Sequence, residues 1–384
     1  MDIKESSSVP YCNIGIMALE SSSELGNRIN DILMKKRGNY VSEPNNYGIG
    51  EKKSFLIKMK DIRFSNGEGK IIIEDTVRGK DIFILCDVGN YSCTYKMFGF
   101  ENHKSPDDHF QDIKRVLSAI GGKARRITVI MPLLYASRQH KRKHRESLDC
   151  AMALKELEKL GVNDIITFDV HDPNVQNAIP LISFDNLYPT YEIVKTILQE
   201  EPDLLIDKTK MLVISPDTGA MDRAVYYSSV LGLDIGLFYK RRDHSKVVNG
   251  RNPIVQHEYM GREVEGQDVL IVDDMIASGE SVFDIVLELK RRKAKRIFVT
   301  ATFALFTEGI EKFNKFYEEG LIDKIYSTNL TYLPKEVKEA KWFCEVDLSQ
   351  FIANIIDNLN YDKSIAPLLD VTSRIKNLLN ERTS

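Results

Sequence analysis

Long hydrophobic runs are absent from this sequence of 384 residues. A helix that crosses a bilayer needs about 20 consecutive apolar residues, and no segment of the chain approaches that length. The opening residues, MDIKESSSVPYCNIG, also lack the basic and then apolar order of a signal peptide. We therefore expect a cytoplasmic protein with no membrane partner.

Cysteine is scarce, and its spacing excludes two classes of site. The five cysteines form no Cys-x-x-Cys pair. An odd number of scattered cysteines fits neither the disulfide framework of a small secreted domain nor the paired spacing of a zinc site. We expect reduced thiols and no structural zinc.

An excess of positive charge is missing as well. The net charge is −3 and the isoelectric point is about 6.2, whereas a domain that binds nucleic acid is normally basic. We therefore expect no nucleic-acid partner. One local basic run, SRQHKRKHRE at residues 137–146, stands out. Such a run is usually a solvated face, so its meaning depends on the residues before it.

The pattern that is present predicts two α/β domains. The chain is longer than one average domain, and 43% hydrophobic with 28% charged residues is typical of a globular protein. Short apolar segments alternate with amphipathic ones; Val282, Ile285, Val286 and Leu289, for example, have helical spacing. This alternation predicts mainly parallel sheets flanked by helices, followed by a helical tail from about Val346.

Polar side chains gather where the predicted strands end. In open α/β sheets, ligands bind at the carboxyl ends of the strands. The four segments FDVHDP, ISPDTGAMDR, YKRRD and VDDMIASGES follow apolar runs. They carry His171, Asp217, Lys240, Arg242, Asp273 and Asp274. We predict one polyanion site with a divalent metal, and a lid over residues 243–266, a long polar segment that could close on the substrate.

The last of these segments has the order expected of a phosphate loop. A strand that begins at Val269 ends in two acids, a small-residue turn follows, and a helix then begins. Small residues let backbone N–H groups approach an anion, and the helix N-terminus adds partial positive charge. Asp, Ser and Gly also occur in ordinary helix caps and turns, so this segment alone leaves both interpretations open.

Six segments in order resemble the ribose-phosphate pyrophosphokinase (phosphoribosyl pyrophosphate synthetase) family. The resemblance runs from about Ile14 to about Leu330, and any one match is weak, whereas six in sequence are specific. The segments are RFSNGEGKIIIEDTVRG, MPLLYASRQHKRKHRE, FDVHDPNVQNAI, VISPDTGAMDRA, YKRRD and VDDMIASGES.

The resemblance implies a fold and a reaction. The fold has two tandem phosphoribosyltransferase-like domains, at residues 1–180 on the ATP side and 181–345 with the ribose-phosphate loop, and then a tail at 346–384. The reaction is transfer of the diphosphate group of MgATP to the anomeric hydroxyl of ribose 5-phosphate, which gives PRPP and AMP. The resemblance also implies a homo-oligomer of dimers assembled into a hexamer, with Phe64 reaching adenine across a subunit interface.

Site residues are also implied by the motif matches. From the residues alone, His171 would hydrogen-bond a phosphate or anchor its turn to Asp169 or Asp172; the resemblance instead makes His171 and Asp217 ligands of Mg²⁺. Lys240 and Arg242 would be catalytic, and their alternate spacing predicts that they share a strand face. The ATP site would comprise Phe64, Asn66, Gly67, Glu68, Arg138 and Gln139. The ribose-phosphate site would comprise Arg242, Asp273, Asp274, Ala277, Ser278, Gly279, Glu280 and Ser281.

Four departures from the family pattern keep alternatives open. Ala277 and Glu280 stand where the family has Asp and a second Gly, and Asn66 and His140 each replace an aspartate. An acid next to a dianionic phosphate is repulsive unless it turns outward, where it would interact favourably with the helix dipole. The alternatives are a different ribosyl acceptor, a non-catalytic regulatory paralogue and a type I phosphoribosyltransferase that consumes PRPP.

Overall fold

The computed structural model describes residues 10–37, 54–142, 144–242 and 254–383, and the chain divides into two compact units. Unit 1 comprises Met1–Tyr188, Asn329–Tyr332 and Leu348–Leu369. Unit 2 comprises Pro189–Thr328, Leu333–Asp347 and Asp370–Ser384. The predicted α/β class with mainly parallel sheets is confirmed, while the domain limits at residues 180 and 345 stay a prediction.

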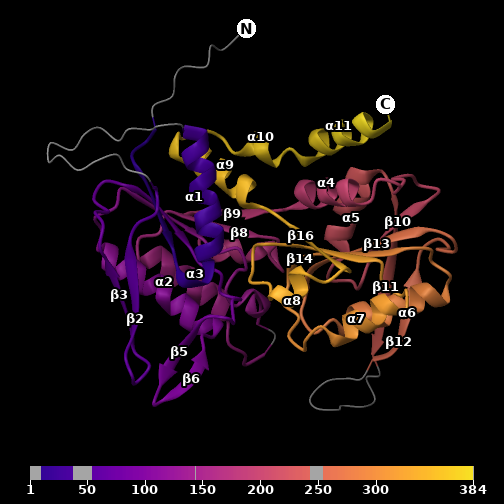
Figure 1. The fold of residues 1–384 in the computed structure, drawn as a ribbon, viewed down its shortest axis with the longest axis horizontal. Helices are drawn as coiled ribbons and strands as arrows, with labels where there is room; N and C mark the ends of the chain where they lie inside the picture. The colour runs from indigo at the N-terminus through magenta and orange to yellow at the C-terminus, as the bar shows by residue number, and fades with distance from the viewer. Residues whose placement is uncertain (1–9, 38–53, 143, 243–253, 384) are drawn as a thin grey trace, which may run out of the picture. The chain divides into compact units, whose positions relative to one another are not determined.

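Unit 1 is built on a five-stranded parallel sheet, β1-β4-β7-β8-β9 (Figure 1). Four of the strands are short, mostly apolar runs that are buried because helices cover the sheet, whereas the edge strand β9 is more polar and less buried; all five residues of β4 are buried. The strands are β1 (Ile14–Ala18), β4 (Asp81–Leu85), β7 (Arg126–Ile130), β8 (Asp164–Phe168) and β9 (Ser183–Leu187). The covering helices include α1 (Ser23–Arg37), α2 (Pro106–Ile120) and α3 (Asp149–Lys159).

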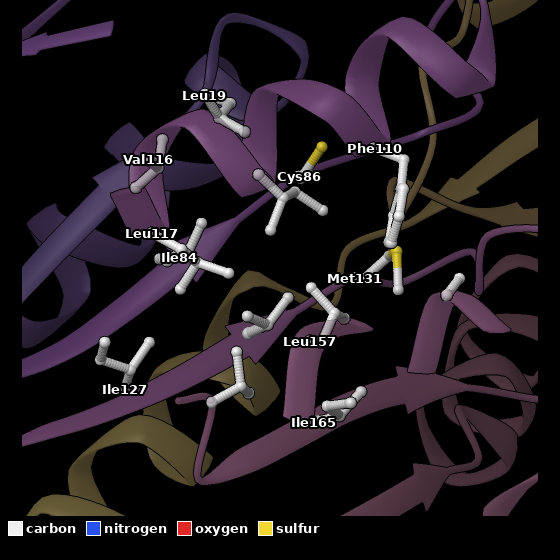
Figure 2. Close-up of a cluster of buried hydrophobic side chains, with 14 of the residues drawn as sticks. Leu19, Ile84, Cys86, Phe110, Val116, Leu117, Ile127, Met131, Leu157 and Ile165 are labelled. Atoms are coloured by element: carbon white, nitrogen blue, oxygen red, sulfur yellow. The ribbon is translucent and has the colours of Figure 1, made fainter. Parts of the chain in front are cut away.

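The core of unit 1 lies between this sheet and its helices. Figure 2 shows Ile84, Ile127 and Ile165 of the strands facing Val116 of α2 and Leu157 of α3. Helix α2 begins at a capping box, in which Ser105 and Asp108 satisfy each other's backbone N–H groups, and it ends at Gly121 with φ of 57°.

Two antiparallel hairpins are added to unit 1. The first joins β2 (Met59–Arg63) to β3 (Gly69–Ile73), and the second joins β5 (Thr94–Met97) to β6 (Phe100–His103). The turns of both hairpins touch, because the Phe98 N–H donates to the Ser65 carbonyl at 2.9 Å. The first hairpin carries part of the predicted ATP site.

Unit 2 is built on a seven-stranded sheet, β12-β11-β10-β13-β14-β15-β16, parallel except for β12. The strands are β10 (Met211–Ser215), β11 (Asp234–Arg242), β12 (Ile254–Met260), β13 (Asp268–Ile276), β14 (Ile297–Ala304), β15 (Lys324–Thr328) and β16 (Phe343–Val346). The helices include α4 (Thr190–Glu200), α5 (Met221–Leu231), α6 (Glu280–Arg291), α7 (Glu311–Glu318) and α8 (Lys335–Lys338).

The C-terminal segment is helical, as predicted, and it is shared between the units. Helix α9 (Ser349–Asn360) and the short α10 (Ala366–Leu369) belong to unit 1, and α11 (Val371–Thr383) belongs to unit 2. Asp357 of α9 pairs with Lys36 and Arg37 of α1, at 2.8 Å in each case. Arg374 of α11 lies over the Tyr191 ring of α4, 3.6 Å from its centroid.

Two predicted segments fall wholly or partly outside the described residues. The segment SEPNNYGIGEKK at residues 42–53, which its proline, asparagine and glycine content predicts to be a loop, lies there, as do residues 243–253 of the predicted lid. The remainder of that lid includes β12, which pairs antiparallel with β11. Among the described residues, the structure contains no helix long and apolar enough to cross a membrane.

Candidate functional site

The strand order of unit 2 creates a switch point between β10 and β13. From β10 the chain passes to β11 on one side, and it then returns to β13 on the other side. Loops that leave the carboxyl ends of such neighbouring strands diverge and leave room for a ligand. Asp217 follows β10, Lys240 and Arg242 end β11, and Asp273 lies near the end of β13. The structure thus brings these predicted residues to one edge of one sheet.

The turn after β10 is shaped by Asp217 itself. Its Oδ1 accepts the N–H groups of Gly219 and Ala220, at 2.8 and 3.2 Å. The Ser215 hydroxyl donates to the Asp217 carbonyl at 2.7 Å. Asp217 is only half-buried. This half-buried carboxylate therefore lies in a hydrogen-bonded turn that follows the carboxyl end of β10.

Asp273 and Asp274 place two carboxylates side by side in β13. Asp274 is 6% exposed, and its N–H donates to Asp273 Oδ1 at 2.9 Å. Burial raises the pKa of Asp273 well above its ordinary value, and the neighbouring Asp274 carboxylate raises it further, while Arg223 of α5 opposes the shift. A cation, or a hydroxyl group that donates a hydrogen bond, would stabilise these two neighbouring carboxylates. A metal ion or a sugar could supply such a group.

The small-residue turn between β13 and α6 has the predicted form. Gly279 has φ of 87°, and an added Cβ would lie 2.4 Å from Phe313 Cζ, so both backbone and packing require glycine. The Thr307 N–H donates to the Ala277 carbonyl at 2.9 Å and ties the turn to the segment after β14. Helix α6 begins at Glu280, whose side chain is exposed. Packing therefore does not force Glu280 toward the anion site.

Strand β11 continues through Lys240 and Arg242, which is the condition on which their shared strand face was predicted. Its pairing with β12 shifts register between Arg241 and Arg242. A bulge of this kind interrupts strict two-residue alternation. The placement of Lys240 and Arg242 on a shared face therefore stays a prediction.

In unit 1, a second polar edge forms where the neighbouring strands β7 and β8 end. Arg138 and Gln139 are exposed in the short 3-10 helix Ser137–Gln139, which follows β7. His171 is exposed after β8. The His140 ring lies between these segments, 5.3 Å from the His171 ring, and its Nε2 is 3.4 Å from Asp172 Oδ2. The predicted residues Arg138, Gln139 and His171 thus come from one edge of this sheet.

The remaining predicted ATP residues form the turn of the β2–β3 hairpin. The Phe64 N–H donates to the Glu68 carbonyl at 2.8 Å, and the Gly67 N–H donates to the Phe64 carbonyl at 2.9 Å. The side chain of Asn66 accepts the Glu68 N–H at 3.1 Å, and Gly67 has φ of 92°. Phe64 is 48% exposed. The turn therefore presents an aromatic ring to solvent on an ordered backbone.

The predicted Mg²⁺ ligands lie in different units, His171 in unit 1 and Asp217 in unit 2. Within the described ranges, no group of three or more His, Cys, Asp or Glu side chains is placed to hold a metal. Magnesium is commonly held by one or two carboxylates together with substrate phosphates and water. The Asp217 carboxylate suits such a role, whereas the imidazole of His171 is a less usual donor for this ion.

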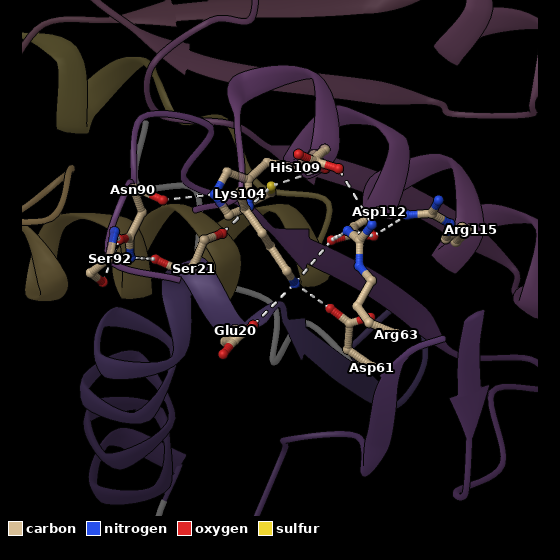
Figure 3. Close-up of polar contacts among 12 residues, drawn as sticks. Glu20, Ser21, Asp61, Arg63, Asn90, Ser92, Lys104, His109, Asp112 and Arg115 are labelled. Carbon is tan, nitrogen blue, oxygen red and sulfur yellow. Dashed lines mark hydrogen bonds and ion pairs between the residues drawn. The ribbon is translucent and has the colours of Figure 1, made fainter. Parts of the chain in front are cut away.

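The sequence reasoning missed a buried charged network between β2 and α2. Figure 3 shows Lys104 contacting Asp61 and Asp112, and Arg63 contacting Asp112. A signal was available, because Asp112 falls within the apolar stripe of α2 next to Ile113. An acid at a core-facing helix position implies a buried partner.

Comparison with known proteins gives a consistent result for both halves of the chain. Residues 14–161 match the N-terminal domain of ribose phosphate pyrophosphokinase, and residues 183–317 match a phosphoribosyl transferase domain. The chain is 30% identical over 303 residues to the ribose-phosphate pyrophosphokinase of Mycoplasma genitalium, across 78% of this chain and 82% of that protein. The enzyme of Vibrio cholerae is 29% identical over 315 residues, across 80% and 90%.

A solved structure shares the fold. Phosphoribosylpyrophosphate synthetase from Mycobacterium smegmatis superposes with a TM-score of 0.70 and 20% identity, covering 90% of this chain and 98% of that one. At this identity the likeness concerns the arrangement of both sheets and their helices.

Proposed function

The chain belongs to the ribose-phosphate pyrophosphokinase family and is an enzyme of that class, and from this premise we propose that it transfers the β,γ-diphosphate of MgATP to the anomeric hydroxyl of ribose 5-phosphate. The products are PRPP and AMP. The fold predicted from the resemblance, two phosphoribosyltransferase-type domains in tandem, is confirmed.

One observation carries the proposal: at the β10–β13 switch point, an acid pair is followed by a small-residue turn and the start of a helix. Asp273 and Asp274 suit the ribose hydroxyls, because carboxylates accept hydrogen bonds from a diol. The turn Ala277–Ser281 suits the 5-phosphate, since small residues and the start of α6 offer backbone N–H groups. A pentose phosphate combines these two chemistries in one ligand.

The nucleotide is proposed to bind at the unit 1 residues. The exposed ring of Phe64 can stack on adenine, and Arg138 and Gln139 can donate to phosphate oxygens. Lys240 and Arg242, at the end of β11, would supply positive charge to the transferred group. Such transfer depends mainly on positioning and on neutralising charge, so these residues need no covalent role.

A magnesium ion suits the Asp217 carboxylate, an oxygen donor of the kind this ion prefers. Asp217 would hold the ion, with His171 proposed as a further ligand, and the ion would supply positive charge that reduces the repulsion met by the attacking hydroxyl. We propose in addition that subunits associate, since the aromatic ring of Phe64 is exposed at the turn of the β2–β3 hairpin. Light scattering of the purified protein measures that association directly.

The deciding experiment identifies the nucleotide product. Purified protein is incubated with Mg²⁺, ATP and ribose 5-phosphate, and AMP, ADP and PRPP are resolved by chromatography. Equal amounts of AMP and PRPP support the proposal, and ADP contradicts it. If the protein instead consumes PRPP together with a nucleobase and without ATP, it is a type I phosphoribosyltransferase. ATP binding without any turnover would favour the regulatory paralogue.

The altered phosphate turn supports one second candidate, a different ribosyl acceptor. Ala277 and Glu280 change the turn that would meet the 5-position of the sugar. A panel of ribosyl compounds with other 5-substituents tests this candidate. AMP release with one of them, but none with ribose 5-phosphate, would assign the enzyme to that acceptor.

A further inference from the structure

Lys104 is a nearly buried cation that meets three carboxylates. Its side chain is 3% exposed, and its Nζ lies 2.5 Å from Asp61 Oδ2, 3.0 Å from Glu20 Oε2 and 3.2 Å from Asp112 Oδ2 (Figure 3). Burial lowers the pKa of Lys104, but the hydrogen bond to Asp61 and the charge of Asp112 outweigh burial and raise it. Lys104 therefore keeps its charge throughout the physiological pH range.

From Lys104 the contacts lead to the proposed nucleotide turn. The side chain of Asp112 is 2% exposed, and both of its carboxylate oxygens also accept hydrogen bonds from Arg63 Nη2, at 3.0 Å each. Arg63 is the last residue of β2, and its Nη1 lies 3.4 Å from the Gly67 carbonyl. One line of ionic and hydrogen bonds thus connects the buried ammonium with the turn Phe64–Glu68.

The second hairpin contacts the same turn. Lys104 follows β6 directly, and its N–H donates to the Cys93 carbonyl at 2.8 Å, which closes the base of that hairpin. At the tip, the Phe98 N–H donates to the Ser65 carbonyl. Met97 Sδ would lie 2.6 Å from a Cβ on Gly67. Lys104 therefore links the base of the second hairpin to the middle of β2, while the tip of the second hairpin contacts the turn.

A purely stabilising role explains this network poorly. The free-energy cost of removing two opposite charges from water largely offsets their attraction. Apolar residues of similar volume often stabilise a core equally well. What the charged network adds is directional contact, because Asp112 of α2 binds Arg63 of β2 directly and Asp61 of β2 through Lys104. Displacing a binding group by about 1 Å can cost roughly 100-fold in rate or affinity.

We propose that Lys104 is a positioning residue, which holds the turn Phe64–Glu68 in the geometry that binds the nucleotide. This inference rests on the proposed function and adds a residue that touches neither substrate. Its loss should weaken nucleotide binding while the transfer step, which is proposed to use groups of unit 2, keeps its rate.

The test compares Lys104→Met with a matched control, Arg126→Met. Arg126 is also a cation paired with a buried acid of unit 1, since its Nη2 lies 2.6 Å from Asp81, but it lies at the start of β7, at the opposite end of the strands from Arg138. For Lys104→Met we expect KM for ATP to rise about tenfold, with kcat within about twofold of wild type. Arg126→Met should change neither constant by more than about twofold.

Hydrogen exchange gives a readout that does not need turnover. Backbone amides of Phe64, Gly67 and Glu68 now donate hydrogen bonds within the turn, and we expect faster exchange at all three in Lys104→Met but not in Arg126→Met. If Lys104→Met does not fold, Asp61→Asn replaces it; Asp61 is 16% exposed, and Lys104 keeps Asp112. The expected rise in KM is then about threefold.

The outcomes separate this inference from the proposed function. An active wild type with unchanged KM for ATP in Lys104→Met, or an equal rise in Arg126→Met, overturns the positioning role. A wild type that forms no AMP overturns the proposed function, and exchange at residues 64–68 then decides the positioning role alone: unchanged exchange rejects it, and selectively faster exchange supports it.

Discussion

The Thr331 hydroxyl donates to the Asp87 carboxylate at 3.0 Å, although 244 positions separate these residues. Asp87 lies just beyond β4 and is 3% exposed. The same carboxylate accepts the N–H groups of Gly89 at 2.8 Å and Tyr332 at 2.9 Å. One buried acid therefore fastens the short segment Asn329–Tyr332 into unit 1.

This arrangement predicts a pH-dependent stability. Burial raises the pKa of Asp87 to about 6, although its hydrogen bonds lower it. The folded state then binds the proton more tightly than the unfolded state, so this group's contribution to the free energy of unfolding should fall as pH rises from about 4 to about 6 and stay level above. The expected difference is about 3 kcal/mol.

Urea unfolding of wild type and Asp87→Asn at several pH values measures this effect. Subtracting one curve from the other removes the contributions of all other groups. The difference should slope between pH 4 and pH 6, since Asn does not titrate. A difference that is constant with pH would mean that folding leaves the pKa of Asp87 unchanged.

Gly279 allows a matched test of the phosphate turn. Gly279→Ala would combine φ of 87° with a Cβ 2.4 Å from Phe313, whereas Gly320→Ala has φ of 68° and no atom within 4 Å of the added Cβ. We expect Gly320→Ala to cost about 1–2 kcal/mol of backbone strain. Gly279→Ala should cost at least about 1–3 kcal/mol more, as overpacking does.

Denaturant unfolding gives both values, and KM for ribose 5-phosphate gives a second comparison. Only Gly279→Ala should raise that KM, because Gly320 lies at the end of α7. Equal destabilisation by both substitutions would show that Phe313 moves aside without cost.

Asp273 should impose a pH dependence on the use of ribose phosphate. Its pKa is raised, mainly by burial and then by Asp274, so lowering the pH should protonate it sooner than an ordinary aspartate. We expect kcat/KM for ribose 5-phosphate to fall as pH decreases through that pKa. Asp273→Asn should lower kcat/KM for ribose 5-phosphate about 10- to 100-fold at neutral pH, and its pH profile should lack the fall at low pH.

Asp234→Asn is the control, since Asp234 stands at the start of β11, at the opposite edge of the sheet. Its profile should match wild type. An unchanged profile in Asp273→Asn would remove Asp273 from the site.

The sequence predicts those structural features that depend on residues close together in the chain. The β13–α6 turn was predicted because strand, acid pair, glycine and amphipathic helix follow one another within a short stretch, and each step has its own signal. The edge shared by Asp217 and Asp273 also follows from topology, since both strands are parallel. Strand β12 was missed because its pairing partner is β11, and the prediction treated residues 243–266 as a polar lid.

Contacts between distant segments were beyond this reasoning. Nothing near Asp87 in the sequence indicates Thr331, and the approach of Lys104 to Asp61 depends on how two hairpins fold onto α2. Such pairs become visible only when tertiary packing brings segments together, which single-sequence patterns do not encode.

Lys240 is expected to act on the reaction and not on folding. Lys240→Ala should remove about 3–4 kcal/mol of transition-state stabilisation, roughly a 100- to 1,000-fold loss in kcat. Lys208→Ala, an exposed lysine of unit 2 before β10, is the control and should keep full activity. Unchanged turnover in Lys240→Ala would contradict the role proposed for the end of β11.

Glu280 decides between the two candidate acceptors. It is exposed in the first turn of α6, where an acid interacts favourably with the helix dipole by about 0.3–1 kcal/mol. If the side chain points to solvent, Glu280→Gln should leave KM for ribose 5-phosphate within about twofold and lower stability by no more than that amount. If it faces the phosphate, removing its charge should lower KM for ribose 5-phosphate several-fold, because like charges repel at close range. Two results together would assign Glu280 as the residue that selects the acceptor. Glu280→Gln would have a lower KM for ribose 5-phosphate, and the wild-type enzyme would turn over an acceptor without the 5-phosphate faster than ribose 5-phosphate.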